Sequence, residues 1–181
     1  MWIGLILAAL VVWSVVEYNS LVQLRVRAGN AWSDIDVQLK RRYDVIPNVV
    51  EAVRGYATHE KNLFVQVSAM RSQAMQAATP KEKEAAESSL TTSLKSLFAV
   101  AENYPQLRAT ENFMNLQQAL LQVEDALQGA RRYYNAVVRD YNTKCEQVPS
   151  SFIARVGKFQ PKEFFQLDSA DQAAPPKVSF S

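Results

Sequence analysis

A regular stripe of apolar residues in the last third of the chain most constrains its fold. Between residues 109 and 147, apolar side chains recur alternately three and four positions apart. The stripe consists of Phe113, Leu116, Leu120, Val123, Leu127, Ala130, Tyr134, Val137 and Tyr141. This period, held over four heptads, predicts a helix of about 58 Å with one buried face. Val148-Pro149 predicts its end.

Three shorter stripes with the same period precede it. They comprise Leu24, Ala28, Ala31, Ile35 and Leu39; then Val49, Val53, Tyr56, Leu63, Val67, Met70 and Ala74; then Leu90, Leu94, Leu97, Ala101 and Tyr104. Glu60 occupies one apolar-phase position of the second stripe. Stripes of this kind predict amphipathic helices that pack through their apolar faces.

Helix-breaking signals separate the stripes. Pro47 opens a new helix or kinks a long one, because the residue before a proline resists helical geometry. Thr79-Pro80-Lys81-Glu82 is a capping box with proline at the first helical position, and Tyr104-Pro105 marks the next boundary. We therefore predict an all-α fold, an antiparallel four-helix bundle with helices near 18–44, 47–78, 80–103 and 106–147. A three-helix arrangement kinked at Pro47 is the alternative.

The N-terminal segment predicts a membrane anchor. Trp2 to Val16 form an apolar run interrupted only by Ser14. This run spans about 22 Å as a helix, against a hydrocarbon core of about 30 Å. Extension to Val22 reaches about 31 Å, with Glu17 and Tyr18 at the interface. A cleaved signal peptide is disfavoured, because nothing basic precedes the run and no small-x-small cleavage site follows it.

Charges next to the run predict the orientation of the chain. Only the amino terminus lies upstream, whereas the downstream side carries Arg25, Arg27, Lys40, Arg41 and Arg42. The positive-inside rule then places the N-terminus outside and the remaining chain in the cytoplasm. We expect three parts: an anchor (1–22), a helical domain (23–167) and a disordered tail (168–181). Residues after Pro149 predict a short helix and an extended strip that returns to the bundle through Phe152, Phe159, Phe164 and Phe165.

Composition limits the chemistry that the chain can perform. The net charge is +2 with acids and bases interspersed, so nothing predicts a nucleic-acid partner. Cys145 is the only cysteine, and we expect it to act as a small apolar residue near a helix end. His59 is the only histidine, so neither an HExxH zinc site nor a paired Glu-x-x-His di-iron site can form.

The remaining chemical alternatives are acidic. A Ca²⁺ or Mg²⁺ site would draw on Asp34, Asp36, Asp44, Glu51 and Glu60, which are close in sequence. We expect instead no catalytic residue, no bound metal, no cofactor and no small-molecule substrate.

Polar residues at positions of the apolar stripes predict a network of hydrogen bonds and ion pairs inside the bundle. Glu60 would need a partner if buried, and Arg71 or Arg131 could supply it. Tyr134 and Tyr141 lie one heptad apart, each followed by an asparagine, and their hydroxyls need partners inside the bundle. We therefore name Glu60, Arg71, Arg131, Tyr134 and Tyr141 as a candidate interhelical network rather than a ligand pocket.

Several segments resemble the LemA family. They are "YNSLV", then "AWSDIDVQLKRRYDVIPNVVEAVRGYATHE", then "AENYPQLRATENFMNLQQAL" and "ARRYYNAVVRDYN". The resemblance covers about 150 residues in order. It implies a single N-terminal anchor, an antiparallel four-helix bundle and a cytoplasmic domain on the bacterial inner membrane. The family has no established catalytic residues, and it is associated with envelope stress, a neighbouring membrane metalloprotease and, in one branch, magnetosome membranes.

Three functional hypotheses follow. The first is a non-enzymatic, membrane-anchored scaffold that acts through self-association and protein partners in maintaining the cell envelope. Gly4 and Ala8 form a small-xxx-small pair through which two anchors could pack. The second is an adaptor or regulator of a membrane metalloprotease in envelope stress. The third is a metal-dependent enzyme using Asp44, Glu51 and Glu60.

Overall fold

A computed structural model describes residues 2–165, and every regular element in that range is a helix. The elements are α1 (Trp2–Arg54), α2 (Lys61–Gln76), α3 (Pro80–Glu102), α4 (Pro105–Arg108), α5 (Glu111–Glu146) and α6 (Ser150–Val156). The predicted all-α class is confirmed. The tail expected over 168–181 lies outside the described residues.

The chain divides into two compact units. The first contains residues 2–45 and 115–164, and the second contains residues 46–114 and Phe165. Helices α1 and α5 each contribute to both.

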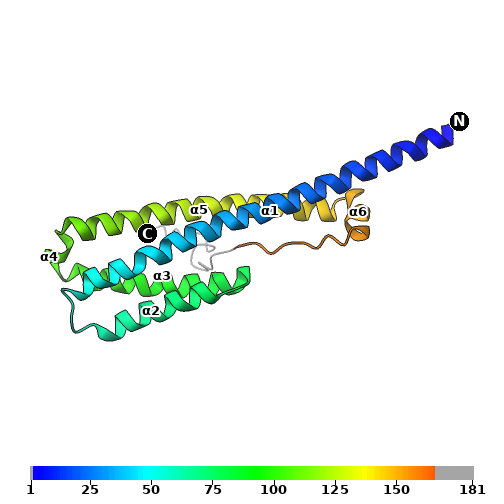
Figure 1. The fold of residues 1–181 in the computed structure, drawn as a ribbon. Helices are drawn as coiled ribbons and strands as arrows, with labels where there is room; N and C mark the ends of the chain where they lie inside the picture. Colours follow the sequence, from blue (N-terminus) through cyan, green and yellow to red (C-terminus); the bar gives the residue numbers. More distant parts are fainter. Residues whose placement is uncertain (1, 166–181) are drawn as a thin grey trace, which may run out of the picture. The chain divides into compact units, whose positions relative to one another are not determined.

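Helix α1 (Figure 1) begins with an apolar segment in which most large side chains are exposed. Only 6% of its most apolar stretch of 18 residues is buried, and by length and composition the helix could cross a membrane. It continues past residue 18 without a break.

The first unit is built on an antiparallel pair of helices, α1 and α5. Along α1, Glu17, Trp32 and Arg42 contact residues of descending number on α5. The carboxylate of Glu17 lies 2.8 Å from Lys144 Nζ, the Trp32 ring lies 5.3 Å from that of Tyr134, and Arg42 Nη2 lies 3.5 Å from a Glu124 oxygen. As the residue number on α1 rises from 17 to 42, the residue number of the partner on α5 falls from 144 to 124. The two helices therefore run in opposite directions. The stripe predicted on α5 is buried or half-buried throughout.

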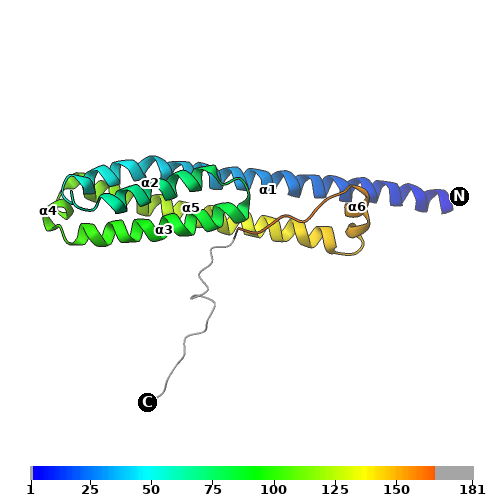
Figure 2. The ribbon, with the colours of Figure 1, turned by 90° about the horizontal axis from the view of Figure 1, so that it is seen from below.

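The second unit contains the end of α1, α2, α3, α4 and the first residues of α5. Helices α2 and α3 lie side by side (Figure 2). Most of their buried residues are apolar: Phe64, Val67 and Ala74 on α2, with Ala86, Leu90, Leu94, Leu97 and Ala101 on α3. Glu87 and Ser93 of α3 are buried as well. The predicted capping box is present, because Thr79 Oγ1 accepts from the Glu82 N–H and the Glu82 carboxylate accepts from the Thr79 N–H. The sequence thus located the start of α3 correctly.

Of the two alternatives at Pro47, the helix boundary is wrong and the long helix that runs through the proline is present. Helix α1 includes Pro47 and ends at Arg54, and residues 55–60 form the connection that was expected to be helical. A proline inside a helix costs about 3 kcal/mol, whereas each fully buried Ile or Val contributes about 1.5–3 kcal/mol. Ile46, Val49 and Val53 are all buried around it, so packing outweighs the lost hydrogen bond.

A second break, between α4 and α5, was missed. The helix expected over 106–147 is interrupted at Ala109 and Thr110. The Thr110 hydroxyl donates to the Leu107 carbonyl at 2.7 Å and accepts from the Phe113 N–H at 3.4 Å. This side chain satisfies backbone groups that the interruption would otherwise leave open.

Candidate functional site

The most elaborate arrangement of side chains lies where four segments of the first unit meet. They are α1 beyond the apolar run, the C-terminal end of α5, α6 and the extended strip 157–164. We call this place the junction. Its core is formed by Leu21, Tyr141, Cys145, Ala154 and Phe159, all buried. The small side chain of Ala154 lets α6 approach the core closely.

An ion pair lies on the side of the junction nearest the apolar run. Glu17 directly follows that run, and its carboxylate lies 2.8 Å from Lys144 Nζ on α5. The side chains are only 19% and 28% exposed, so solvent screens them little. A carboxylate beside an apolar segment is thereby neutralised within the protein.

Phe159 is the aromatic centre of the strip. Its ring lies 5.4 Å from that of Tyr18 in an edge-on arrangement, and the Arg25 guanidinium carbon lies 5.1 Å from its centroid. These are the geometries of an aromatic pair and a cation–π contact. A Cβ at Gly157 would lie only 2.5 Å from a Phe159 ring carbon. The ring position therefore requires glycine at 157.

The strip follows α5 because side chains of that helix bind its backbone (Figure 2). The Tyr141 hydroxyl donates to the Gln160 carbonyl at 3.0 Å, and the Tyr134 hydroxyl donates to the Glu163 carbonyl at 2.8 Å. Asn142 makes a paired contact with Lys162, donating to its carbonyl at 2.9 Å and accepting from its N–H at 2.8 Å. These contacts supply the strip with the backbone partners that a strand would receive from a sheet.

Burial in the junction makes its titratable groups inert near neutral pH. Desolvation, with the neighbouring Cys145 thiol, raises the pKa of Tyr141 to about 12. Desolvation also raises the pKa of the Cys145 thiol, while its hydrogen bond to Tyr141 acts in the opposite direction. A buried thiol with a raised pKa is a poor nucleophile.

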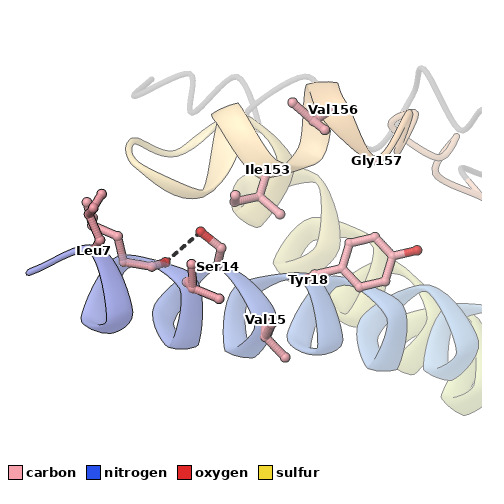
Figure 3. A pocket seen from close by; sticks show the side chains of 9 residues that line it. Leu7, Ser14, Val15, Tyr18, Ile153, Val156 and Gly157 are labelled. Atoms are coloured by element: carbon pink, nitrogen blue, oxygen red, sulfur yellow. Dashed lines mark hydrogen bonds between the residues drawn. The ribbon is translucent and has the colours of Figure 1, made fainter. Parts of the chain in front are cut away.

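An apolar groove adjoins the junction on its N-terminal side (Figure 3). It encloses about 640 Å³ between α1 and α6, and its lining is mainly aliphatic. Leu7, Leu10, Val11 and Val15 contribute from α1, with Ile153 and Val156 from α6. Ser14 adds little polarity, because its hydroxyl already donates to the Leu10 carbonyl at 2.8 Å.

The structure distributes the residues of the candidate network over both units. Tyr134 and Tyr141 lie together on α5 and both bind the strip. Arg131 is buried on α5, and Arg71 is half-buried on α2. Glu60 is the half-buried residue preceding α2, where its side chain makes no capping hydrogen bond. A network joining all five residues stays a prediction, whereas the bonds from the two tyrosines to the strip are present.

The acids considered for a metal site have other surroundings. Asp44 pairs with Lys40 at 2.9 Å and Glu51 pairs with Arg54 at 3.2 Å, both within α1, while His59 is exposed. Within residues 2–165, no group of three or more His, Cys, Asp or Glu side chains is placed to hold a metal ion.

The sequence predicts that the segment after Pro149 returns to the bundle through four phenylalanines, and burial confirms this for two of them. Phe159 and Phe165 are buried, but Phe152 is 61% exposed and Phe164 is 40% exposed. The sequence reading missed the roles of Asn142, Glu17 and Gly157. The Tyr-Asn repeat was the visible signal for Asn142. The Glu17–Lys144 pair joins residues 127 positions apart, and no local pattern announces it.

Comparison with known proteins yields one family and several distant relatives. The sequence profile of the LemA family matches residues 31–180. Magnetosome proteins MamQ 1 and MamQ 2 of Paramagnetospirillum magneticum are each 22% identical over 176 residues, covering 83% of this chain and 65% of theirs. Protein LemA of Metamycoplasma hominis is 24% identical over 160 residues, covering 83% of this chain and 72% of its own. The chain thus spans less than two thirds of the two magnetosome proteins.

Proposed function

Because the chain belongs to the LemA family, we propose that it is a non-enzymatic scaffold anchored by a single membrane-spanning helix. Its helical part, arranged as an antiparallel four-helix bundle, binds protein partners and further copies of the chain. We place that part on the cytoplasmic side of the bacterial inner membrane, because Arg25 and Arg27 follow the apolar run.

The exposed start of α1 is the observation that carries the proposal. Apart from Trp13, which is half-buried, the large apolar side chains from Trp2 to Val16 are between 53% and 76% exposed. Apolar helices of water-soluble domains bury such residues in a core. A continuous apolar helix whose large side chains are mostly exposed fits a lipid environment.

The chemistry of the reactive side chains supports a non-enzymatic role. Cys145 is buried, and burial raises the pKa of its thiol. His59 is exposed and lies 86 positions earlier in the sequence. Asp44 and Glu51 are each held by a basic neighbour on α1. Neither a nucleophile with its base nor a set of free carboxylates is thus assembled among the described residues.

Self-association has two supporting features. A Cβ added at Gly4 would meet nothing within 4 Å, so a second helix has room to approach closely there. On α5, Leu121 and Tyr133 are 61% and 51% exposed, although Leu120 and Tyr134 beside them are buried. These residues extend the apolar surface of α5 beyond its packed face.

The size of the full chain in mild detergent tests the proposal. We expect assemblies larger than a monomer at micromolar concentration, and a shift toward monomer in the variant Gly4→Leu/Ala8→Leu. Ala9→Leu is the matched control, because position 9 lies outside that pair. A wild-type protein that is strictly monomeric would contradict self-association. Recovery of a metalloprotease with the extracted protein would favour the adaptor hypothesis instead.

A further inference from the structure

The apolar run of α1 is followed directly by turns of the same helix that pack against protein. Leu21 is fully buried in the junction, and Glu17, the first residue after the run, pairs with Lys144. If the membrane is crossed by α1, the junction itself must enter its boundary.

Helix α6 lies beside the C-terminal half of the apolar run. Ile153 and Val156 of α6 line the groove together with residues 7 to 18 of α1 (Figure 3). One face of α6 packs on the junction through Ala154. The opposite face is apolar as well, since Phe152 is 61% exposed and Val156 is 85% exposed. Phe152 and Val156 are four positions apart, so they share a helix face.

This outward face is continuous with the surface of the anchor. The groove has Leu7, Leu10 and Val11 of the apolar run on one side and α6 on the other. Val148, just before α6, is 71% exposed and extends the apolar surface further. Apolar patches of this kind on a water-facing surface mark sites that something covers.

Basic side chains flank the apolar face. Arg25 and Arg27 on α1 are exposed, as are Arg155 and Lys158 at the end of α6. Glu17, the acid nearest the apolar run, is already paired with Lys144. Basic residues next to an apolar helix face are the pattern of helices that lie in the headgroup region of anionic membranes.

We propose that α6 is an interfacial helix that docks on the bilayer surface. Phe152 and Val156 enter the boundary between headgroups and acyl chains, and phospholipid acyl chains fill the groove between α6 and α1. Interfacial helices sink about 5–10 Å into this boundary. The inference rests on the membrane anchoring proposed above.

Spin labels at three positions of the full chain test the proposal. Each is a single cysteine carrying a nitroxide in a Cys145→Ala background: Leu10→Cys in the anchor, Val156→Cys on α6 and Ser33→Cys further along α1. All three native side chains are exposed, so labelling disturbs no core. Ser33 serves as the reference outside the membrane, because it lies about 26 Å along α1 beyond Val16, the end of the apolar run. The protein is placed in vesicles of phosphatidylethanolamine and phosphatidylglycerol, with circular dichroism as the check on folding.

The measurement compares collisions of each label with oxygen, which concentrates in lipid, and with a water-soluble nickel chelate. We expect the oxygen-to-nickel ratio at Val156 to be shifted toward that of Leu10 and to exceed that of Ser33. A ratio at Val156 equal to that at Ser33, with Leu10 in lipid, would overturn the inference and leave the anchor intact. A water-exposed Leu10 would refute the anchor itself. Spin–spin broadening between Val156 labels would show that a second copy, not lipid, covers α6.

Discussion

At the scale of single residues, Tyr141 links α5 to the strip. It is 1% exposed and donates its hydroxyl hydrogen to the Gln160 carbonyl. We expect Tyr141→Phe to lower the free energy of unfolding by about 1 kcal/mol, because one net hydrogen bond is lost. Urea titration of the full chain in mild detergent measures this. Tyr133→Phe is the control: that neighbour is 51% exposed, and a similar loss there would contradict the assignment.

The same residue makes stability depend on pH in the alkaline range. Burial raises the pKa of Tyr141 from 10.0 in the unfolded chain to about 12 in the folded one. The folded state therefore holds its proton more tightly, so this contribution is complete below pH 10 and is lost as pH rises through 12. The pKa of Cys145 is raised as well and acts in the same direction. We expect the unfolding free energy to fall over this window, and to fall less steeply in Tyr141→Phe.

At the scale of elements, the end of α6 depends on one glycine. A Cβ at position 157 would lie 2.5 Å and 2.9 Å from two carbons of the Phe159 ring, which Tyr18 and Arg25 hold in place. We expect Gly157→Ala to destabilise the chain by about 1–3 kcal/mol through this overpacking. Thermal unfolding monitored by circular dichroism measures the loss.

A second glycine supplies the control for that change. Gly129 lies within α5, and a Cβ there would meet nothing within 4 Å. Gly129→Ala should therefore stabilise the helix by about 0.5–1 kcal/mol. Equal effects of the two substitutions would show that Phe159 does not restrict position 157.

At the scale of the whole molecule, the proposed anchoring predicts one orientation. Arg25 and Arg27 follow the apolar run. We expect a phosphatase fused to the C-terminus to be inactive in cells and a fluorescent protein fused there to be bright, because the positive-inside rule leaves the C-terminal side in the cytoplasm. An active phosphatase would reverse the topology. Removing two of the basic residues, with Arg25→Gln and Arg27→Gln, should weaken the preference.

The all-α class, the stripe on α5, the start of α3 and the apolar segment of α1 could be predicted from the sequence. Each depends on neighbours within one or two helical turns, where periodicity and capping act directly. Tertiary packing decided the rest. Pro47 lies inside α1 because buried Ile46, Val49 and Val53 outweigh its local cost. The contacts of Glu17 with Lys144 and of Tyr141 with Gln160 join distant residues. Their partners are selected by how the helices pack, a choice that no local pattern encodes.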